Sequence, residues 1–294
     1  MQSLAVVSRE LSEVSARVEA SVVSVQARGG CGASGLVWRS DLVVTTARAL
    51  ERGERVEVVA RGQRLATKLV GVHQASDLAV LRVDGELSAL PWAAPDSLAV
   101  AELVLAFARP ADRLRARLGI VSVLGEKWRL AGGTEFERYI ESDLAPAPGF
   151  SGGPLVRATG ELIGLNNGRL SRGALLTLPA AGVARIVDAL LAHGRVPRAH
   201  LGVAVQAVAL PHALAEKLGR ASALLVMSVQ AGSAAERAGL MLGDLLLELD
   251  GTGLSRVGDL ESALGEVTLG AELALELVRA GERLPLSVRA EERG

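Results

Sequence analysis

The feature that most constrains the fold is a series of short, valine-rich apolar runs separated by turn residues over residues 21–83. Runs of this length between turn signals are typical of strands in an antiparallel barrel. Only 2% of the residues are aromatic, so such a core must be built from valine, leucine and alanine. The expected strands are residues 21–25, 36–38, 42–45, 56–59, 65–70 and 78–83.

A second series of the same kind follows the loop at residues 93–97 and predicts a second barrel of similar size. After it, Pro179 begins a stretch in which apolar residues recur every three or four positions, which predicts a helix. Gly194 and Pro197 end this helix and mark a domain boundary. The expected strands are residues 103–107, 118–124, 136–140, 153–157, 161–165 and 174–178.

Both ends of the chain differ from this β pattern. Apolar residues from Leu4 to Val18 recur at helical spacing, and we expect this helix to pack on the body of the protein, with an oligomer contact as the alternative. Beyond residue 195, strand patterns alternate with helical ones and end in a hairpin at Ala280-Gly281. The expected domains are an N-terminal helix at 1–20, a double barrel with its helix at 21–194 (barrels at about 21–95 and 96–180), and a small domain at 195–294.

Composition excludes several classes of function. The formal net charge of -1 gives no basic footprint for nucleic acid. Cys31 is the single cysteine, so no intrachain disulfide is possible. No apolar stretch reaches the length of a membrane span, and residues 1–10 lack a signal-peptide pattern, which leaves the compartment open. The sequence has no metal-ligand cluster and no phosphate-binding loop, and we expect no cofactor.

The most specific motif is Gly149-Phe150-Ser151-Gly152-Gly153-Pro154, a serine enclosed by glycines. Glycines allow positive φ angles, so the amides of Gly149 and Ser151 can point at one position and hold a developing oxyanion. A serine hydroxyl is a weak nucleophile unless a base lies beside it. The alternative is a tight turn between two strands.

Asp77 is the candidate for an acid that orients such a base. It directly precedes the apolar run Leu78–Leu81, and a carboxylate desolvated there needs a partner. By itself Asp77 would be interpreted as a turn residue that caps its loop. The presence of Ser151 in the second barrel favours the role of orienting acid.

Several stretches together resemble the HtrA/Deg (protease Do-like) family of serine proteases, from about residue 20 to residue 290. The resemblance implies a mainly β fold: a trypsin-like double β-barrel followed by one PDZ domain, a small α/β barrel. It implies that Ser151 has the nucleophile position, Asp77 the position of the orienting acid, and Gly149 a place in the oxyanion hole. The matching stretches are residues 21–25, 32–37, 43–50, 77–81, 149–155, 201–203, 238–240 and 243–244.

Where the family has its catalytic histidine, this sequence has Arg48. Arginine has a pKa above about 12 and no acceptor atom, so it cannot serve as a general base. We expect Arg48 to form a bidentate pair with Asp77, which would leave Ser151 without a base. Among the four histidines only His73 lies in the first barrel, and the family's fold would place it away from Ser151.

Two further features bear on the site. His193, His200 and His212 are expected to be solvated surface residues. Phe150 occupies a position where the family usually has a small polar residue, and a bulky apolar side chain there is expected to repack or tilt the oxyanion loop.

The resemblance also implies a peptide-binding site. Leu201, Gly202 and Val203 resemble the PDZ loop whose amides capture the terminal carboxylate of a peptide, and the helix at 257–264 would frame the groove. The alternative is a domain that only packs against the barrels or against a neighbouring subunit.

The predicted function is an HtrA-like serine protease homologue that is catalytically inactive and binds peptides or unfolded proteins through its PDZ domain and protease cleft. The alternatives are an active serine endopeptidase of protein quality control with a non-standard base, and a structural subunit of a hetero-oligomer. The family implies a homotrimer or hetero-oligomer and a periplasmic or other extracytoplasmic location, with the cytoplasm as the alternative.

Overall fold

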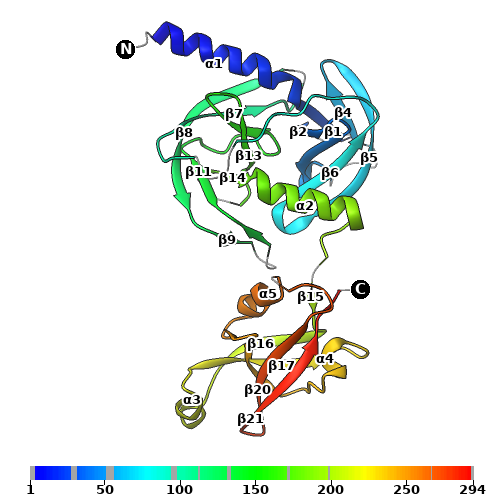
Figure 1. The fold of residues 1–294 in the computed structure, drawn as a ribbon, viewed down its shortest axis with the longest axis vertical. Helices are drawn as coiled ribbons and strands as arrows, with labels where there is room; N and C mark the ends of the chain where they lie inside the picture. The colour runs from blue at the N-terminus through cyan, green and yellow to red at the C-terminus, as the bar shows by residue number, and fades with distance from the viewer. Residues whose placement is uncertain are drawn as a thin grey trace. The chain divides into compact units, whose positions relative to one another are not determined.

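The fold was analysed in a computed structural model, in which the chain divides into two compact units, one within residues 1–196 and one that includes residues 197–294 (Figure 1). Cys31 lies outside the described part of the chain. The structure describes residues 4–27, 32–50, 56–93, 98–111, 113–130, 134–170, 173–197, 199–265 and 267–292.

The first barrel is closed and antiparallel, with the strand order β1-β2-β3-β6-β5-β4. Its interior is filled largely by valine and leucine from every strand, which confirms the barrel predicted from the valine-rich runs. The strands are β1 (Val22–Ala27), β2 (Ala33–Arg39), β3 (Leu42–Thr46), β4 (Val56–Ala60), β5 (Gln63–His73) and β6 (Leu78–Val83).

The second barrel is also closed, with the order β11-β14-β13-β12-β7-β8. The predicted strand at 136–140 is wrong in its start, because Glu135–Phe136 (β10) pairs with Trp128–Arg129 (β9) outside the barrel. Phe136 is fully buried, beside Gly182 of the following helix and stacked on Trp128. The apolar residue that suggested a barrel strand is therefore buried by a helix instead. The barrel strands are β7 (Leu103–Ala108), β8 (Arg115–Gly125), β11 (Tyr139–Ser142), β12 (Pro154–Arg157), β13 (Leu162–Asn167) and β14 (Leu175–Pro179).

Two helices accompany the barrels (Figure 1). Helix α2 (Ala180–His193) contacts β5 of the first barrel and both β13 and β14 of the second, and its buried side chains include Ile186 and Leu190. Helix α1 (Leu4–Val18) buries only Val14 and Val18, whereas Leu4 is 88% exposed. The expected packing of α1 on the body therefore holds for its last turns alone. No helix in the described ranges is long and apolar enough to cross a membrane.

The main antiparallel sheet of the second unit has the order β16-β17-β18-β20-β21, with β19 paired to β18, and β15 and β22 form a separate pair. Leucine dominates its core, which is closed by α4 and α5. Helix α3 was not anticipated from the sequence, because its single buried residue, Leu218, gives no periodic pattern. The elements are β15 (Ala199–His200), β16 (Val203–Ala209), α3 (His212–Leu218), β17 (Ser222–Val229), α4 (Ala234–Arg237), β18 (Leu245–Leu249), β19 (Thr252–Gly253), α5 (Val257–Gly265), β20 (Glu272–Arg279), β21 (Glu282–Arg289) and β22 (Glu291–Glu292).

A bidentate ion pair ties this sheet together. The Asp244 side chain is 1% exposed and accepts two hydrogen bonds of 2.8 Å from Arg279 and one of 2.8 Å from the Met241 amide. Burial by itself raises the pKa of Asp244, but the hydrogen bonds from Arg279 and Met241 and the charge of Arg279 outweigh it and hold the pKa below 3.8. The ionised carboxylate therefore stabilises the folded unit.

We predict that Asp244→Asn destabilises the second unit by about 2 kcal/mol, because two charge-assisted hydrogen bonds lose their acceptor charge. Since the pKa of Asp244 is lower in the folded state than 3.8, its contribution is present above that value and is lost as the pH falls through the folded pKa. Hydrogen exchange of the β17 and β18 amides measures both effects. Glu276→Gln, at the exposed pair with Arg283, serves as control and should change stability by less than about 0.5 kcal/mol.

Candidate active site

The loop that carries Ser151 is a pair of tight turns at the start of β12. The Phe150 amide donates to the Ala147 carbonyl at 3.1 Å, and the Gly153 amide donates to the Phe150 carbonyl at 3.1 Å. Gly149 and Gly152 have φ angles of 88° and 84°, a conformation that side chains rarely adopt. A Cβ atom on Gly152 would also lie 2.3 Å from the Ser34 carbonyl oxygen of the first barrel. The glycines are therefore required by both backbone angle and close packing.

These turns leave two amides without an acceptor. Among the described residues, no carbonyl or side chain accepts a hydrogen bond from the Gly149 or Ser151 amide. Amides that are fixed by a rigid loop and not engaged elsewhere can bind a carbonyl oxygen or an oxyanion. Gly149 and Ser151 are the two residues that the sequence predicted for this role, and their hydrogen-bonding capacity fits it.

The Ser34 hydroxyl holds the loop from the opposite barrel. It donates to the Gly149 carbonyl at 2.6 Å and accepts from the Arg109 amide at 2.6 Å. Ser34 is fully buried on β2, so both backbone groups depend on it. The sequence analysis assigned no role to Ser34. A polar residue beside Gly35 in an otherwise apolar strand was the one feature that could have indicated a buried hydrogen bond.

A second connection between the barrels lies beside Ser151. The Ser151 hydroxyl oxygen accepts a 3.0 Å hydrogen bond from the Gly168 amide, just after β13. The preceding residue, Asn167, is fully buried and donates from its side chain to the Ser76 carbonyl at 3.0 Å. Ser76 is adjacent to Asp77, so these contacts bring Ser151 and the turn of Asp77 into one site.

Asp77 ends the short helix η3 (Gln74–Ser76) with a left-handed backbone, at φ 53°. Its carbonyl accepts from the Ala47 amide at 2.9 Å, and its Oδ1 accepts from the Arg48 amide at 3.1 Å. The side chain is 3% exposed. The backbone amide of residue 48 thus orients the carboxylate through Oδ1. The other oxygen, Oδ2, is the one nearer the side chain of residue 48.

The expected bidentate pair between Arg48 and Asp77 is wrong. One guanidinium nitrogen, Nη2, lies 3.9 Å from Oδ2 of Asp77, and the Arg48 side chain is 55% exposed. The helix η2 (Ala47–Ala49) carries Arg48, and the Arg48 amide already occupies Oδ1. At this distance the guanidinium makes no hydrogen bond with the carboxylate, and its exposure to solvent weakens their attraction. Arg48 therefore supplies positive charge at the mouth of the site and no proton acceptor.

The histidines have other positions. His73 is buried at the end of β5, and its Nδ1 lies 2.7 Å from the Ser76 hydroxyl, so it supports the turn that carries Asp77. His193 and His212 are exposed and His200 is half-buried, in line with the expected surface positions. No described contact joins any of these rings to Ser151.

The Phe150 side chain is buried in the core of the second barrel. Its ring is 4% exposed and packs among residues that include Val104 and Leu155. The Arg117 guanidinium carbon lies 5.0 Å from the ring centroid, a cation–π contact. The hydrogen-bonded turns on both sides of Phe150 are retained.

The predicted carboxylate-binding loop of the second unit precedes the edge strand β16. Gly202 has a φ of 83°, and a Cβ atom there would lie 2.2 Å from Cβ of Ser233. The carbonyls of Leu201 and Gly202 are engaged by Ala235 and Gln230, whereas no described residue accepts from the Leu201 or Gly202 amide. Helix α5 contacts β16, which has a paired strand on one side only.

A hollow of about 600 Å³ adjoins this loop. Leu201, Gly202 and Val203 line it together with the segment after β17, and no α5 residue does. This hollow therefore lies next to the loop, and it is distinct from the predicted peptide groove between β16 and α5. In the described ranges, no group of at least three His, Cys, Asp or Glu residues is placed to hold a metal ion.

The chain is similar to known proteases over both units. The family profile of the trypsin-like peptidase domain matches residues 33–165, and that of the PDZ domain matches residues 199–289. A putative serine protease HhoA of Synechocystis is 30% identical over 276 residues, which are 88% of this chain and 70% of that protein.

Two further relatives extend the comparison. A probable periplasmic serine endoprotease DegP-like of Chlamydia trachomatis is 29% identical over 87% of this chain and 53% of its own length, so the chain spans about half of that protein. The solved structure of the HtrA-type protease AlgW with tripeptide is 27% identical, with a TM-score of 0.72 over 97% of both chains.

We predict that Ser34→Ala destabilises the first unit by about 2 kcal/mol, because it removes the hydrogen bonds that the fully buried Ser34 hydroxyl makes with the Gly149 carbonyl and the Arg109 amide. Urea unfolding followed by tryptophan fluorescence measures this, since Trp38, Trp92 and Trp128 all precede residue 197. Ser12→Ala on the exposed surface of α1 is the matched control and should leave the midpoint within error. Equal midpoints for the two variants would contradict the role assigned to Ser34.

Proposed function

Because the chain belongs to the HtrA/Deg family of trypsin-like serine proteases with a PDZ domain, we propose that it binds polypeptides without cutting them. The observation that carries this proposal is Arg48. It stands on the turn whose amide orients Asp77, where a base would have to accept the proton of Ser151. The relatives are named as proteases, so the proposed inactivity rests on residues of this chain alone.

The chemistry of acyl transfer supports the proposal. As Ser151 attacks a carbonyl carbon, its proton must pass to an acceptor that can later return it to the leaving amine. Arg48 offers donors only, and His73 is engaged with Ser76. Loss of a triad member lowers turnover by about a millionfold, leaving what the oxyanion hole and binding supply. The hydroxyl of Ser151, held by Gly168, remains a hydrogen-bonding group.

The binding parts of the site support a non-cutting role. The amides of Gly149 and Ser151 can donate to a carbonyl oxygen of a bound chain. The amides of Leu201 and Gly202 can receive a terminal carboxylate while a peptide adds as a strand beside β16. A chain with these two functions would act as a chaperone, a scaffold or a regulator of an active protease.

Two further points are part of the proposal. The DegP-like relative is named periplasmic, and we place this protein outside the cytoplasm on that basis. The apolar residues that α1 leaves exposed support assembly with further subunits, as a homotrimer or a hetero-oligomer.

We predict that the protein neither cleaves casein nor reacts with a fluorophosphonate probe, because Ser151 has no general base. Arg48→His should restore labelling of Ser151, since the Asp77 carboxylate is already oriented by the amide of residue 48 and has Oδ2 available to a histidine. Mass spectrometry of the labelled peptide measures the reaction.

Arg48→His combined with Ser151→Ala is the control and should remain unlabelled. Labelling of Ser151 in the unmodified protein would overturn the proposal in favour of an active endopeptidase with another base. If Arg48→His stays silent, labelling of Arg48→His with Phe150→Asn would locate the remaining defect at Phe150.

Peptide binding by the second unit gives a separate prediction. A fluorescent peptide with a free C-terminal carboxylate should bind, and its amidated form should bind at least tenfold more weakly. Gly202→Ala should weaken binding by a similar factor, because its Cβ meets Ser233. Gly219→Ala is the matched control, since Gly219 has a φ of 68° and open space around it. Fluorescence anisotropy measures all four, and equal binding of the two peptides would contradict carboxylate capture.

A further inference from the structure

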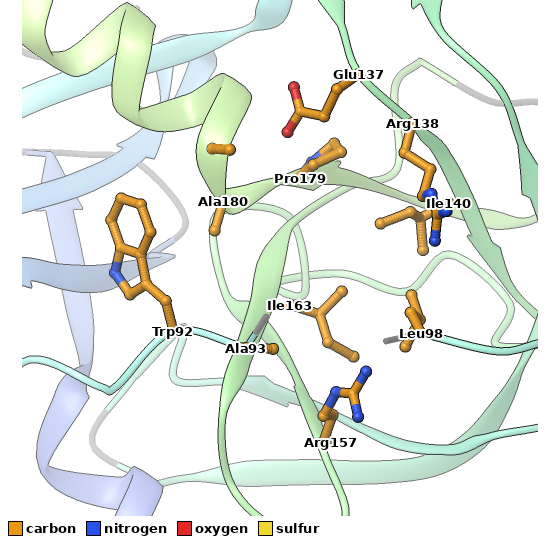
Figure 2. Close-up of a pocket in the computed structure, with 11 residues that line it drawn as sticks. Trp92, Ala93, Leu98, Glu137, Arg138, Ile140, Arg157, Ile163, Pro179 and Ala180 are labelled. Carbon is orange, nitrogen blue, oxygen red and sulfur yellow. The ribbon is translucent and has the colours of Figure 1, made fainter. Parts of the chain in front are cut away.

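The first unit contains a second candidate site, away from the residues assigned above. A pocket of about 410 Å³ opens between the second barrel, the segment before it and the start of α2 (Figure 2). None of its lining residues belongs to the Ser151 loop or to the turns of Arg48 and Asp77. Its volume is within the range of small-molecule sites.

The walls of the pocket are aliphatic. In the close-up Ile140, Ile163 and Leu98 lie together, Ala93 lies beside Ile163, and Ala180 lies toward Trp92. Trp92 stands at one side, 45% exposed, and its ring centroid is 4.8 Å from that of Trp38. These surfaces favour a saturated, flexible chain over a large polar ligand.

Three charged side chains border this apolar space, and two of them have partners. Glu137 accepts from the Gly182 amide at 3.1 Å and pairs with Arg185 at 2.9 Å, which caps the start of α2. Arg157 lies 3.1 Å from a Glu102 carboxylate oxygen. Both charges are therefore compensated within the protein.

Arg138 is the exception among the described residues. Its guanidinium has no hydrogen bond or ion pair there, while its backbone carbonyl accepts from the Trp128 indole. In Figure 2 the side chains of Arg138 and Arg157 extend toward the pocket from opposite sides. Within the described part of the chain, the pocket thus combines an aliphatic lining with one positive charge that has no partner, which a monoanionic ligand would balance.

We propose that this pocket binds an aliphatic monocarboxylate, a medium-chain fatty acid, with the carboxylate on Arg138 and the chain among Leu98, Ile140 and Ile163. A guanidinium matches a carboxylate through two parallel hydrogen bonds. A carboxylate carries one negative charge at neutral pH, as a single free guanidinium requires, whereas a phosphate monoester carries nearly two. This site is independent of the proposed peptide-binding function.

The test is calorimetric titration of the full chain with hexanoate, octanoate and decanoate below their micellar concentrations. We expect one site per chain and about fourfold tighter binding for each added methylene until the pocket is full. Tryptophan fluorescence should change with the same dissociation constant, because Trp92 borders the pocket and residues 197–294 contain no tryptophan. Octylamine, which has the same chain and the opposite charge, should not bind.

Two variants test the two halves of the site. Arg138→Gln should weaken decanoate binding at least tenfold, while Arg64→Gln, at an exposed ion pair of the first barrel, should leave it unchanged. Ala181→Phe keeps the charge but fills the pocket, and it should also abolish binding.

The proposal is overturned if binding does not saturate at one site, if Arg138→Gln binds decanoate as the parent does, or if Ala181→Phe folds and binds normally. It is also overturned if a short peptide ending in leucine changes the tryptophan signal at lower concentration than decanoate does, because the occupant would then be a polypeptide terminus.

Discussion

The candidate active site depends on buried hydrogen bonds that cross between the two barrels. The Ser34 hydroxyl of the first barrel joins the Gly149 carbonyl to the Arg109 amide, and the Asn167 amide of the second barrel reaches the Ser76 carbonyl. The Ser34 and Asn167 side chains are fully buried, so loss of either one removes hydrogen bonds from its backbone partners. These bonds hold the Ser151 loop against the turn of Asp77, and the site exists only while the barrels are docked in this way.

This framework is compatible with an arginine at position 48. Asp77 is held by the Ala47 and Arg48 backbone amides, which any residue except proline provides. The side chain at position 48 is therefore under little structural constraint, and the arginine extends into solvent with a 3.9 Å contact to the carboxylate. A framework maintained by the backbone does not depend on which side chain stands at position 48.

Prediction from sequence succeeded where a signal is local and periodic. Valine-rich runs identify the strands of both barrels, and the glycines around Ser151 identify a special turn. Prediction failed where a residue's partner is distant in the sequence. Ser34 and Asn167 form hydrogen bonds with the opposite barrel, and Phe136 is buried beside Gly182 of α2. The bidentate pair of Arg48 failed for another reason, since the sequence does not show that the backbone amide already occupies Oδ1 of Asp77.

Both polypeptide-binding sites proposed for this chain use the same chemistry. In each, a glycine with positive φ, Gly149 or Gly202, leaves neighbouring backbone amides without an acceptor and is fixed by close packing, against Pro110 or Ser233. Such amides bind carbonyl or carboxylate oxygens and do not depend on a titratable side chain. Under the proposed function, the absence of a base at position 48 prevents bond cleavage but does not affect these amides, so recognition of a peptide backbone does not require a histidine there.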